Sequence, residues 1–214
     1  MSVETAEVVV IGGGAMGTST AWHLAEIGIT DVVLLERDAL GAGSSSKSAG
    51  GVRAQFADEL NVRIALRSIA ELERFREKVG ADIGFQRAGY LFLLDDEEDV
   101  TLFRWALGLQ AELGVPSREL SAEEAAALVP GLDTSGVLAA TFCPLDGYVT
   151  PEAVVAGWAA AARERGVRIR TGEEAVRIDV LGSRIRGVDT RRGRISTNTV
   201  VCAAGVWSRD VAKL

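Results

Sequence analysis

The sequence is poor in the residues that build metal sites and disulfides. Its 214 residues include one histidine, His23, and two cysteines, Cys143 and Cys202. These three side chains offer no spacing typical of metal ligands, so we expect no metal ion. Both cysteines lie in strand-like apolar segments, which favours buried, reduced thiols and a cytoplasmic protein. His23 falls in the middle of a predicted helix, where we interpret it as a structural residue.

A surplus of positive charge is also missing. Aspartate and glutamate number 30 against 23 lysines and arginines, a net charge of −7, which argues against nucleic acid as a partner. No apolar run reaches membrane-spanning length, and no basic region leads into an apolar stretch near Met1. We therefore expect no membrane partner and no secretory signal. A hydrophobic share of 48% and a charged share of 25% are typical of a globular protein.

Glycine, by contrast, is plentiful, and it forms one ordered motif near the N-terminus. The apolar run Val8 to Ile11 leads into Gly-Gly-Gly-Ala-Met-Gly at residues 12–17 and then into a helix-compatible stretch. A second apolar run, residues 32–35, ends on Glu36, which lies 19 residues after Gly17. A G-x-G-x-x-G turn between a strand and a helix, with an acid at the end of the next strand, is typical of a dinucleotide-binding βαβ unit.

Each part of this motif has a chemical reason. Gly12 permits a tight turn, Gly14 lets the backbone approach a pyrophosphate, and Gly17 lets the helix pack closely on the sheet. The helix N-terminus offers free N–H groups to the phosphates. Glu36 can accept hydrogen bonds from ribose hydroxyls, and its charge disfavours the 2′-phosphate of NADP. An ordinary glycine-rich turn is the simpler alternative, and the motif alone does not choose between NAD and FAD.

A second segment, residues 41–53, is rich in glycine and serine. A flexible linker is one interpretation of such a composition. Lys47 and Arg53 bracket the small residues, however, and a long loop inside a compact domain is usually functional. Small side chains with free hydroxyls suit a surface that contacts a long polar cofactor, so we favour cofactor contact.

The rest of the chain alternates between helical and strand-like patterns. A long amphipathic helix is predicted over residues 58–79, and the acidic run 95–99 fits the first turn of a helix that extends to residue 113. Ser121 opens a capping box, and Pro151 starts a helix to Arg165. Strands are predicted at residues 83–85, 89–94, 137–142, 167–170, 175–180, 184–190 and 200–204, the last as a buried parallel strand.

Four separated blocks of the chain together resemble one protein family. Residues 9–17 with Glu36, residues 43–56, residues 146–151 and residues 200–208 are similar to the FAD-dependent D-amino-acid-oxidase-like (DAO) oxidoreductases. The match is to their glycine oxidase, sarcosine oxidase β-subunit and dimethylglycine dehydrogenase branch, and residues 89–94 resemble that family's entry into its substrate domain.

The resemblance implies an α/β chain, α+β overall, with a Rossmann-like FAD-binding βαβ domain and an inserted, partial antiparallel-sheet substrate domain. We expect the FAD-binding domain at residues 1–80 and 145–214 and the substrate domain at residues 81–144. The chain stops where the resembled family continues, so the C-terminal half of the family fold is expected to be absent or supplied by a partner chain.

The resemblance also implies that the cofactor is FAD. The loop after the second strand has no histidine for a covalent link, so we expect non-covalent binding. The residues implied in cofactor binding are Ile11, Gly12, Gly14, Ala15, Met16, Gly17, Glu36, Arg37, Ser44, Ser45, Ser46, Lys47, Ser48, Ala49, Gly50, Gly51, Val176, Ala203, Ala204, Gly205 and Trp207.

The family oxidises C–N bonds of amino acids or N-methyl amines such as sarcosine, dimethylglycine or glycine, so a small amine or amino acid is the expected substrate. The catalytic residues are unknown, and Arg53 is the one candidate for substrate or flavin contact. Pairing of Arg53 with Asp58 or Glu59 at a helix start is the structural alternative. Two other functions stay open: a non-catalytic FAD-binding fragment or subunit that needs a partner chain, and an NAD-dependent dehydrogenase.

Overall fold

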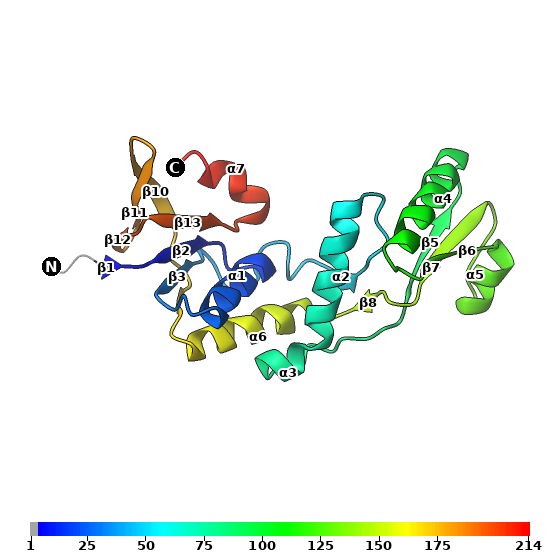
Figure 1. Cartoon of the computed structure of the whole chain (residues 1–214), viewed down its shortest axis with the longest axis horizontal. Helices are drawn as coiled ribbons and strands as arrows, with labels where there is room; N and C mark the ends of the chain where they lie inside the picture. The colour runs from blue at the N-terminus through cyan, green and yellow to red at the C-terminus, as the bar shows by residue number, and fades with distance from the viewer. Residues whose placement is uncertain (1–3) are drawn as a thin grey trace. The chain divides into compact units, whose positions relative to one another are not determined.

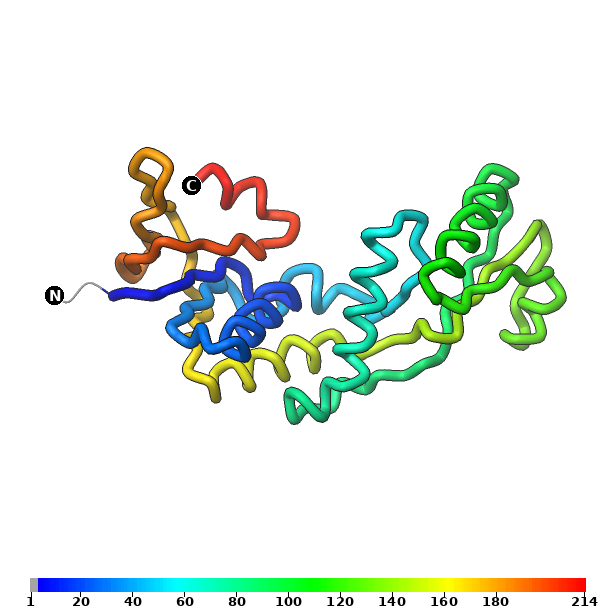
Figure 2. Tube along the Cα trace, in the orientation of Figure 1, coloured from blue at the N-terminus to red at the C-terminus, as the bar shows by residue number. Residues whose placement is uncertain are grey.

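The structure, a computed structural model, describes residues 4–214. The chain forms two compact units. The first unit comprises the described residues up to Ala49, Glu77–Ile83 and Thr150–Leu214, and the second comprises Gly50–Arg76 and Gly84–Val149. Figure 2 traces the path by which the chain leaves the first unit, returns to it briefly and enters it again at Thr150.

The first unit is organised by a four-stranded parallel sheet in the order β13-β2-β3-β9. These strands are β2 (Val8–Ile11), β3 (Val32–Leu35), β9 (Arg168–Arg170) and β13 (Thr199–Cys202). Every residue of β2 and β3 is buried. Continuous runs of valine, leucine and isoleucine suit central strands that are covered on both faces, so the predicted βαβ unit is confirmed.

Alternate residues of β2 and β3 face two different layers. Val8, Val10, Val32 and Leu34 pack with α1 (Ala15–Glu26) and α6 (Pro151–Glu164), through residues such as Trp22. The remaining residues of both strands pack against Val188 and Ile195 of a second sheet, with strand order β1-β12-β11-β10. Its strands are β1 (Glu4–Thr5), β10 (Ala175–Leu181), β11 (Arg184–Thr190) and β12 (Gly193–Ser196). Figure 1 shows α1 and α6 on one side of the parallel strands and β10 to β12 on the other.

The chain beyond β13 is short. The 3-10 turn η1 (Gly205–Trp207) leads into α7 (Ser208–Val211). Because β13 is the edge strand of its sheet, it is only half-buried, and Cys202 is exposed. The prediction of a fully buried strand with a buried thiol is therefore wrong at Cys202, whereas Cys143 is buried as expected.

The second unit is built on an antiparallel sheet in the order β5-β7-β6. Its strands are β5 (Tyr90–Leu94), β6 (Arg118–Leu120) and β7 (Ala139–Cys143), and β4 (Gly51–Val52) pairs with β8 (Gly147–Tyr148). The helices are α2 (Glu59–Glu73), α4 (Glu97–Glu112) and α5 (Ala122–Leu128). Asp96 caps α4 and Ser121 forms the capping box of α5, which confirms both predicted helix starts.

Three predicted boundaries differ from the structure. The single helix expected over residues 58–79 is divided at Arg74 into α2 and α3 (Phe75–Val79), and the Phe75 side chain is buried directly after the break. Residues 83–85 form no strand, and an isolated bridge joins Gln86 to Tyr148 instead. The strand expected at 137–142 starts at Ala139.

Residues 50–76 pack differently from the expected domain division, which placed them with the cofactor-binding part. In the structure they belong to the second compact unit. Ala54, Val62, Ala65 and Ile69 share a hydrophobic cluster with Cys143 of β7, and burial of these apolar side chains groups them with the antiparallel sheet. Within residues 4–214, no helix combines the length and the apolarity needed to cross a bilayer.

Candidate dinucleotide site

The carboxyl ends of β2, β3 and β13 meet at one edge of the parallel sheet, in the first unit. A cavity of about 730 Å³ lies there, a size typical of small-molecule sites. In open parallel sheets, ligands bind at the carboxyl ends of the strands. The predicted residues that line the cavity are Ile11, Gly12, Gly14, Ala15, Met16, Glu36, Arg37, Ser44, Ser45, Lys47, Ala203, Ala204, Gly205 and Trp207.

Two glycines of the motif are required by close backbone approaches. Gly12 has φ +115°, and a Cβ at this position would lie well under 3.0 Å from the Ala203 carbonyl oxygen. A Cβ at Gly17 would come even closer to the carbonyl oxygen of Gly12. Only glycine fits at either position. Gly17 therefore lets α1 start directly against the turn after β2, although its own atoms do not line the cavity.

The N-terminus of α1 opens onto the cavity without a capping side chain of its own. Gly14 is the N-cap residue, and the first turn carries no acidic side chain. The amide of Ala15 donates to the Ser45 hydroxyl at 3.0 Å. A helix N-terminus with exposed N–H groups and a neighbouring hydroxyl is a site for an anion such as a phosphate.

Glu36 is fixed between the glycine turn and its own loop. Its carboxylate accepts hydrogen bonds from the Gly13 amide at 2.7 Å and the Asp38 amide at 2.8 Å. Its backbone N–H donates to the Arg170 carbonyl, and its carbonyl accepts from the Glu173 amide, both at 2.9 Å. Since each carboxylate oxygen has two lone pairs, Glu36 keeps acceptor capacity for ribose hydroxyls while its side chain is held in place.

The glycine- and serine-rich loop is held in place at several points. The Gly41 amide donates to the Gly13 carbonyl at 2.9 Å, and a Cβ at Gly43 would lie 3.1 Å from the Trp207 ring. The Arg37 guanidinium stacks over that ring, 4.5 Å from its centroid. These contacts bring the loop, the end of β3 and the turn after β13 together. The loop is therefore an ordered wall of the cavity rather than a flexible linker.

Some predicted residues do not line the cavity, and others were missed. The structure leaves Gly17, Ser46, Ser48, Ala49, Gly50, Gly51 and Val176 outside the lining. It adds Gly13, Thr20, Leu35, Asp38, Ala42, Gly43, Glu173, Glu174, Ala175, Val201, Cys202, Ser208, Asp210, Val211 and Leu214. Seven of these fifteen additions directly adjoin a predicted residue in the sequence. Glu173 and Asp210 come from a turn and a short helix that carry no motif, so no sequence signal pointed to them.

Val176 lies at an irregularity of β10 rather than in the cavity. Ala175 pairs with Thr190 and Arg177 with Asp189, so the register shifts at Val176. β10 is an edge strand, and such bulges leave one residue outside the regular ladder. The neighbouring Ala175 does line the cavity, which leaves the predicted backbone contact from Val176 a prediction.

Arg53, in the second unit, is flanked by two aromatic rings. Its guanidinium lies 4.7 Å from the centroid of Phe56 and 5.0 Å from that of Phe92. The structural alternative, an ion pair with Asp58 or Glu59, is not what the structure shows. Asp58 instead accepts from the Asn61 amide at 2.9 Å, and Glu59 pairs with Arg63 at 2.7 Å. Arg53 therefore keeps its charge available for another anion.

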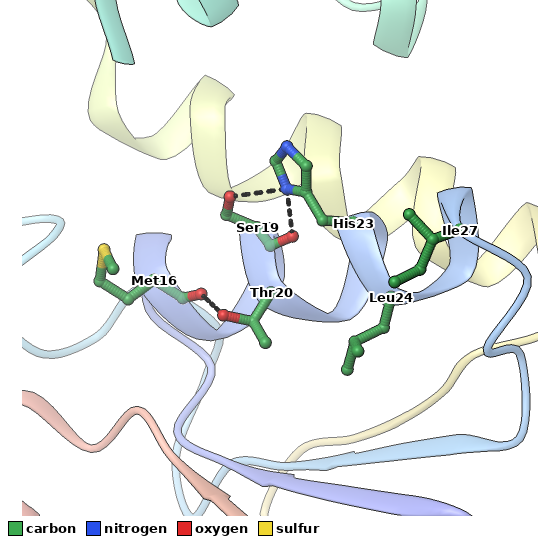
Figure 3. A pocket seen from close by; sticks show the side chains of 6 residues that line it. All are labelled: Met16, Ser19, Thr20, His23, Leu24 and Ile27. Atoms are coloured by element: carbon green, nitrogen blue, oxygen red, sulfur yellow. Dashed lines mark hydrogen bonds between the residues drawn. The ribbon is translucent and has the colours of Figure 1, made fainter. Parts of the chain in front are cut away.

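A second hollow, of about 400 Å³, runs along the outer face of α1. Figure 3 shows its lining residues: Met16, Ser19, Thr20, His23 and Leu24 on α1, and Ile27 directly after the helix. The Nδ1 atom of His23 lies 2.8 Å from the Ser19 carbonyl oxygen and 3.2 Å from its hydroxyl. These contacts lie within one helical turn and agree with the structural interpretation of His23. Among residues 4–214, no cluster of histidine, cysteine, aspartate and glutamate could hold a metal ion.

Comparison with known proteins gives a single family. Its profile, described as DAO, FAD dependent oxidoreductase, matches residues 7–214. The chain is 32% identical to mitochondrial dimethylglycine dehydrogenase of Rattus norvegicus over 212 residues, which cover 99% of this chain and 25% of that protein. The chain thus spans about a quarter of the length of this curated relative.

Solved structures of the same fold cover a larger part of their own chains. L-proline dehydrogenase from P. horikoshii superposes with a TM-score of 0.90 at 37% identity, over 97% of this chain and 55% of that one. Glycine oxidase from Geobacillus kaustophilus gives a TM-score of 0.85 at 28% identity, over 99% of this chain and 58% of that one. The mixed α/β fold predicted from the sequence is confirmed by both.

Proposed function

Because the chain belongs to the DAO family of FAD-dependent oxidoreductases, we propose that it binds FAD non-covalently and acts in oxidising a C–N bond of an amino acid or N-methyl amine. The observation that carries the proposal is the cavity of the first unit, where the glycine turn, the open N-terminus of α1 and Glu36 share one wall. This arrangement provides the donors and the acceptor that the two ends of an ADP group need.

The residues present fit FAD. Gly12 and Gly17 keep the turn free of side chains, since a Cβ at either would collide with backbone. The amides at the start of α1 and the Ser45 hydroxyl would hold the pyrophosphate, and Glu36 would accept from the adenosine ribose. Ala203 and Ala204, at the end of β13, would back the cofactor with small side chains.

FAD, when bound, supplies an acceptor for the hydride equivalent that leaves the carbon next to the substrate nitrogen. The chain's own contribution is to bind and orient the substrate. Arg53 is a half-buried residue whose guanidinium is flanked by two phenylalanine rings. A planar guanidinium pairs with a carboxylate through two parallel hydrogen bonds, so we assign Arg53 to the carboxylate of an amino-acid substrate.

Non-covalent attachment is supported by the position of the single histidine. His23 faces Ser19 on α1, and no histidine occurs in the loop after β3. Acid precipitation of the FAD-loaded chain should release all flavin into the supernatant. Flavin retained in the precipitate would overturn this part of the proposal, and Cys202, which lines the cavity, would then be the side chain to replace first.

The central test is a titration of the purified chain with FAD, followed by anaerobic exposure to sarcosine, dimethylglycine, glycine, L-proline and D-amino acids. We expect saturable FAD binding and bleaching of the flavin by at least one of these compounds. Glu36→Gln should weaken FAD binding about tenfold, because an amide cannot accept from both the Gly13 and Asp38 amides. Glu26→Gln, the same change at the exposed far end of α1, is the matched control.

Two outcomes would contradict the proposal. A chain that ignores FAD and binds NADH would be an NAD-dependent dehydrogenase. A chain that binds FAD but is reduced by none of the amines would be a non-catalytic FAD-binding subunit.

We also propose that a further polypeptide segment, whether in a longer form of this chain or in a partner chain, completes the substrate side of the site. The proposal is supported by coverage, since the matched solved structures extend well beyond the matched part. Val206 and Met16, both beside the cavity, are 74% and 73% exposed, as expected of residues that a further segment covers. We expect the amine to bleach the flavin more slowly in this chain alone than in a form that carries the further segment. Equal rates in the two forms would contradict the proposal.

We propose that the protein is located in the cytoplasm. This proposal rests on the two unpaired thiols, Cys143 and Cys202, since reducing compartments keep cysteines free. Cell fractionation tests it, and recovery of the protein in mitochondria, where the dimethylglycine dehydrogenase relative resides by name, would overturn it.

A further inference from the structure

The second unit contains a buried carboxylate that the proposed function does not use. Asp146 lies between β7 and β8, and its side chain is fully buried. A charged group is costly to bury unless it is hydrogen-bonded, so its partners indicate why this position holds an aspartate.

Both oxygens of Asp146 bind the segment that directly follows Arg53. Oδ1 accepts from the Ala54 amide at 2.7 Å, and Oδ2 accepts from Nε2 of Gln55 at 3.2 Å. Ala54 and Gln55 are themselves buried. The carboxylate thus binds one backbone donor and one side-chain donor, 92 and 91 residues away in the sequence.

Gln55 extends this cluster into the sheet. Its Nε2 also donates to the Tyr90 carbonyl at 2.9 Å, and its Oε1 accepts from the Thr141 hydroxyl at 2.9 Å. Tyr90 begins β5 and Thr141 lies within β7. The segment after Arg53 is therefore tied to two strands of the antiparallel sheet through one glutamine and one aspartate.

We infer that Asp146 is a positioning residue for Arg53: by holding Ala54 and Gln55 it fixes the backbone from which the guanidinium projects between Phe56 and Phe92. The inference rests on the proposed role of Arg53 in binding a substrate carboxylate. A side chain aimed at a small ligand needs its backbone fixed within a fraction of an ångström, because a preorganised donor loses less entropy on binding.

Electrostatics agree with this geometry. Burial raises the pKa of Asp146, while the hydrogen bonds from Ala54, Gln55 and the Cys143 thiol and the nearby Arg53 cation act to lower it. The other titratable group at this carboxyl is the Cys143 thiol, whose pKa burial also raises. Among the described residues, the Arg53 guanidinium lies over the rings of Phe56 and Phe92 and not in an ion pair with Asp146. The two rings flank the guanidinium, and we infer that its donors stay open to an outside anion.

The test compares Asp146→Asn with the unaltered chain, both loaded with FAD. Asparagine is nearly isosteric, yet its amide group would meet the Gln55 amide as a second donor. The first readout is the NMR signal of the Arg53 Nε–H group, identified by its loss in Arg53→Lys. We expect a strong heteronuclear NOE in the unaltered chain and a clear drop in Asp146→Asn, since the guanidinium gains mobility.

The second readout is the affinity for L-proline and for pyrrolidine, which differs from it only by lacking the carboxylate. Asp146→Asn should weaken L-proline binding about tenfold and leave pyrrolidine binding unchanged. A merely structural role would weaken both ligands alike. Asp133→Asn is the matched control, because this exposed aspartate of the same unit caps a turn at Ser135 and should alter neither readout.

Gln55→Met is the second variant and decides the matter if Asp146→Asn does not fold. It leaves the bond to Ala54 in place, so a smaller drop of the Arg53 NOE is expected. An unaltered Arg53 signal in the folded variant would overturn the inference. Equal affinities of the unaltered chain for L-proline and pyrrolidine would contradict the proposed role of Arg53 in binding a carboxylate. The NOE of Arg53 would still decide whether Asp146 positions Arg53.

Discussion

The two units build their polar sites by different means. In the first unit the glycine turn shapes the cavity, because a Cβ at Gly12 or Gly17 would collide with the carbonyl oxygen of Ala203 or of Gly12. In the second unit the polar cluster around Asp146 consists mostly of side chains buried in a sheet. A backbone site depends on which positions lack a side chain, whereas a side-chain cluster depends on which residue supplies each donor and acceptor.

Two carboxylates, one from each unit, have pKa values shifted in opposite directions. Glu4 of the first unit is partly exposed and receives a hydrogen bond from Arg170, which lowers its pKa. Asp146 of the second unit is buried, and desolvation raises its pKa. The Glu4 carboxylate is stabilised as an anion by the Arg170 cation. The Asp146 side chain is held in the core by hydrogen bonds from neutral donors.

The largest expected effect compares two helical glycines. Gly17→Ala in α1 should cost about 3 kcal/mol of unfolding free energy, since its Cβ would overlap the Gly12 carbonyl oxygen, and should abolish FAD binding. Gly108→Ala in α4 meets no atom within 4 Å and should raise stability by about 1 kcal/mol. Urea unfolding measures both. Equal changes in unfolding free energy for Gly17→Ala and Gly108→Ala would contradict the conclusion that the first unit needs glycine for close backbone approach.

The next effect is a pair of opposite pH dependences. The raised pKa of Asp146 means that the folded chain holds its proton more tightly, so this group's contribution falls as pH rises from 3.8 through the folded value. The lowered pKa of Glu4 means that its contribution is present above 4.5 and is lost as pH falls through the folded value.

We therefore expect the stability difference between the unaltered chain and Asp146→Asn to shrink with rising pH, and that for Glu4→Gln to grow. Urea titrations that start below the ordinary pKa values of both groups, 3.8 and 4.5, and extend to neutral pH measure both differences. Slopes of the same sign would contradict the distinction between the two carboxylates.

The smallest expected effect concerns the two stacked arginines. Arg37→Met keeps the side-chain stem but removes the cation over Trp207, at a cost of about 0.5–1 kcal/mol. Arg53→Met, which removes a cation between two rings, should cost slightly more. The cost of Arg37→Met should vanish in a Trp207→Leu background, which has no aromatic face, only if the stack is the cause. Arg209→Met on α7 serves as the control for a lost surface charge.

Much of the first unit could be predicted because its determinants are local. The turn at residues 12–17, the strands on either side and Glu36 lie within one segment, and the hydrogen bond from Gly13 to Glu36 spans only 23 residues. The capping box at Ser121 was predictable for the same reason, since all its parts lie within four residues. Errors arose where a neighbour decides the outcome: Cys202 is exposed because β13 has a neighbour on one side only.

The sequence by itself determined the order of strand, glycine turn, helix and acid, because steric limits at glycine and the period of apolar residues act between near neighbours. The tertiary structure alone decided that Ala203 would face Gly12, that Trp207 would lie under Arg37, and that Asp146 would bind Ala54 and Gln55. These contacts join residues that are 91 or more positions apart. Which distant groups meet depends on the packing of whole layers, and no local pattern records that packing.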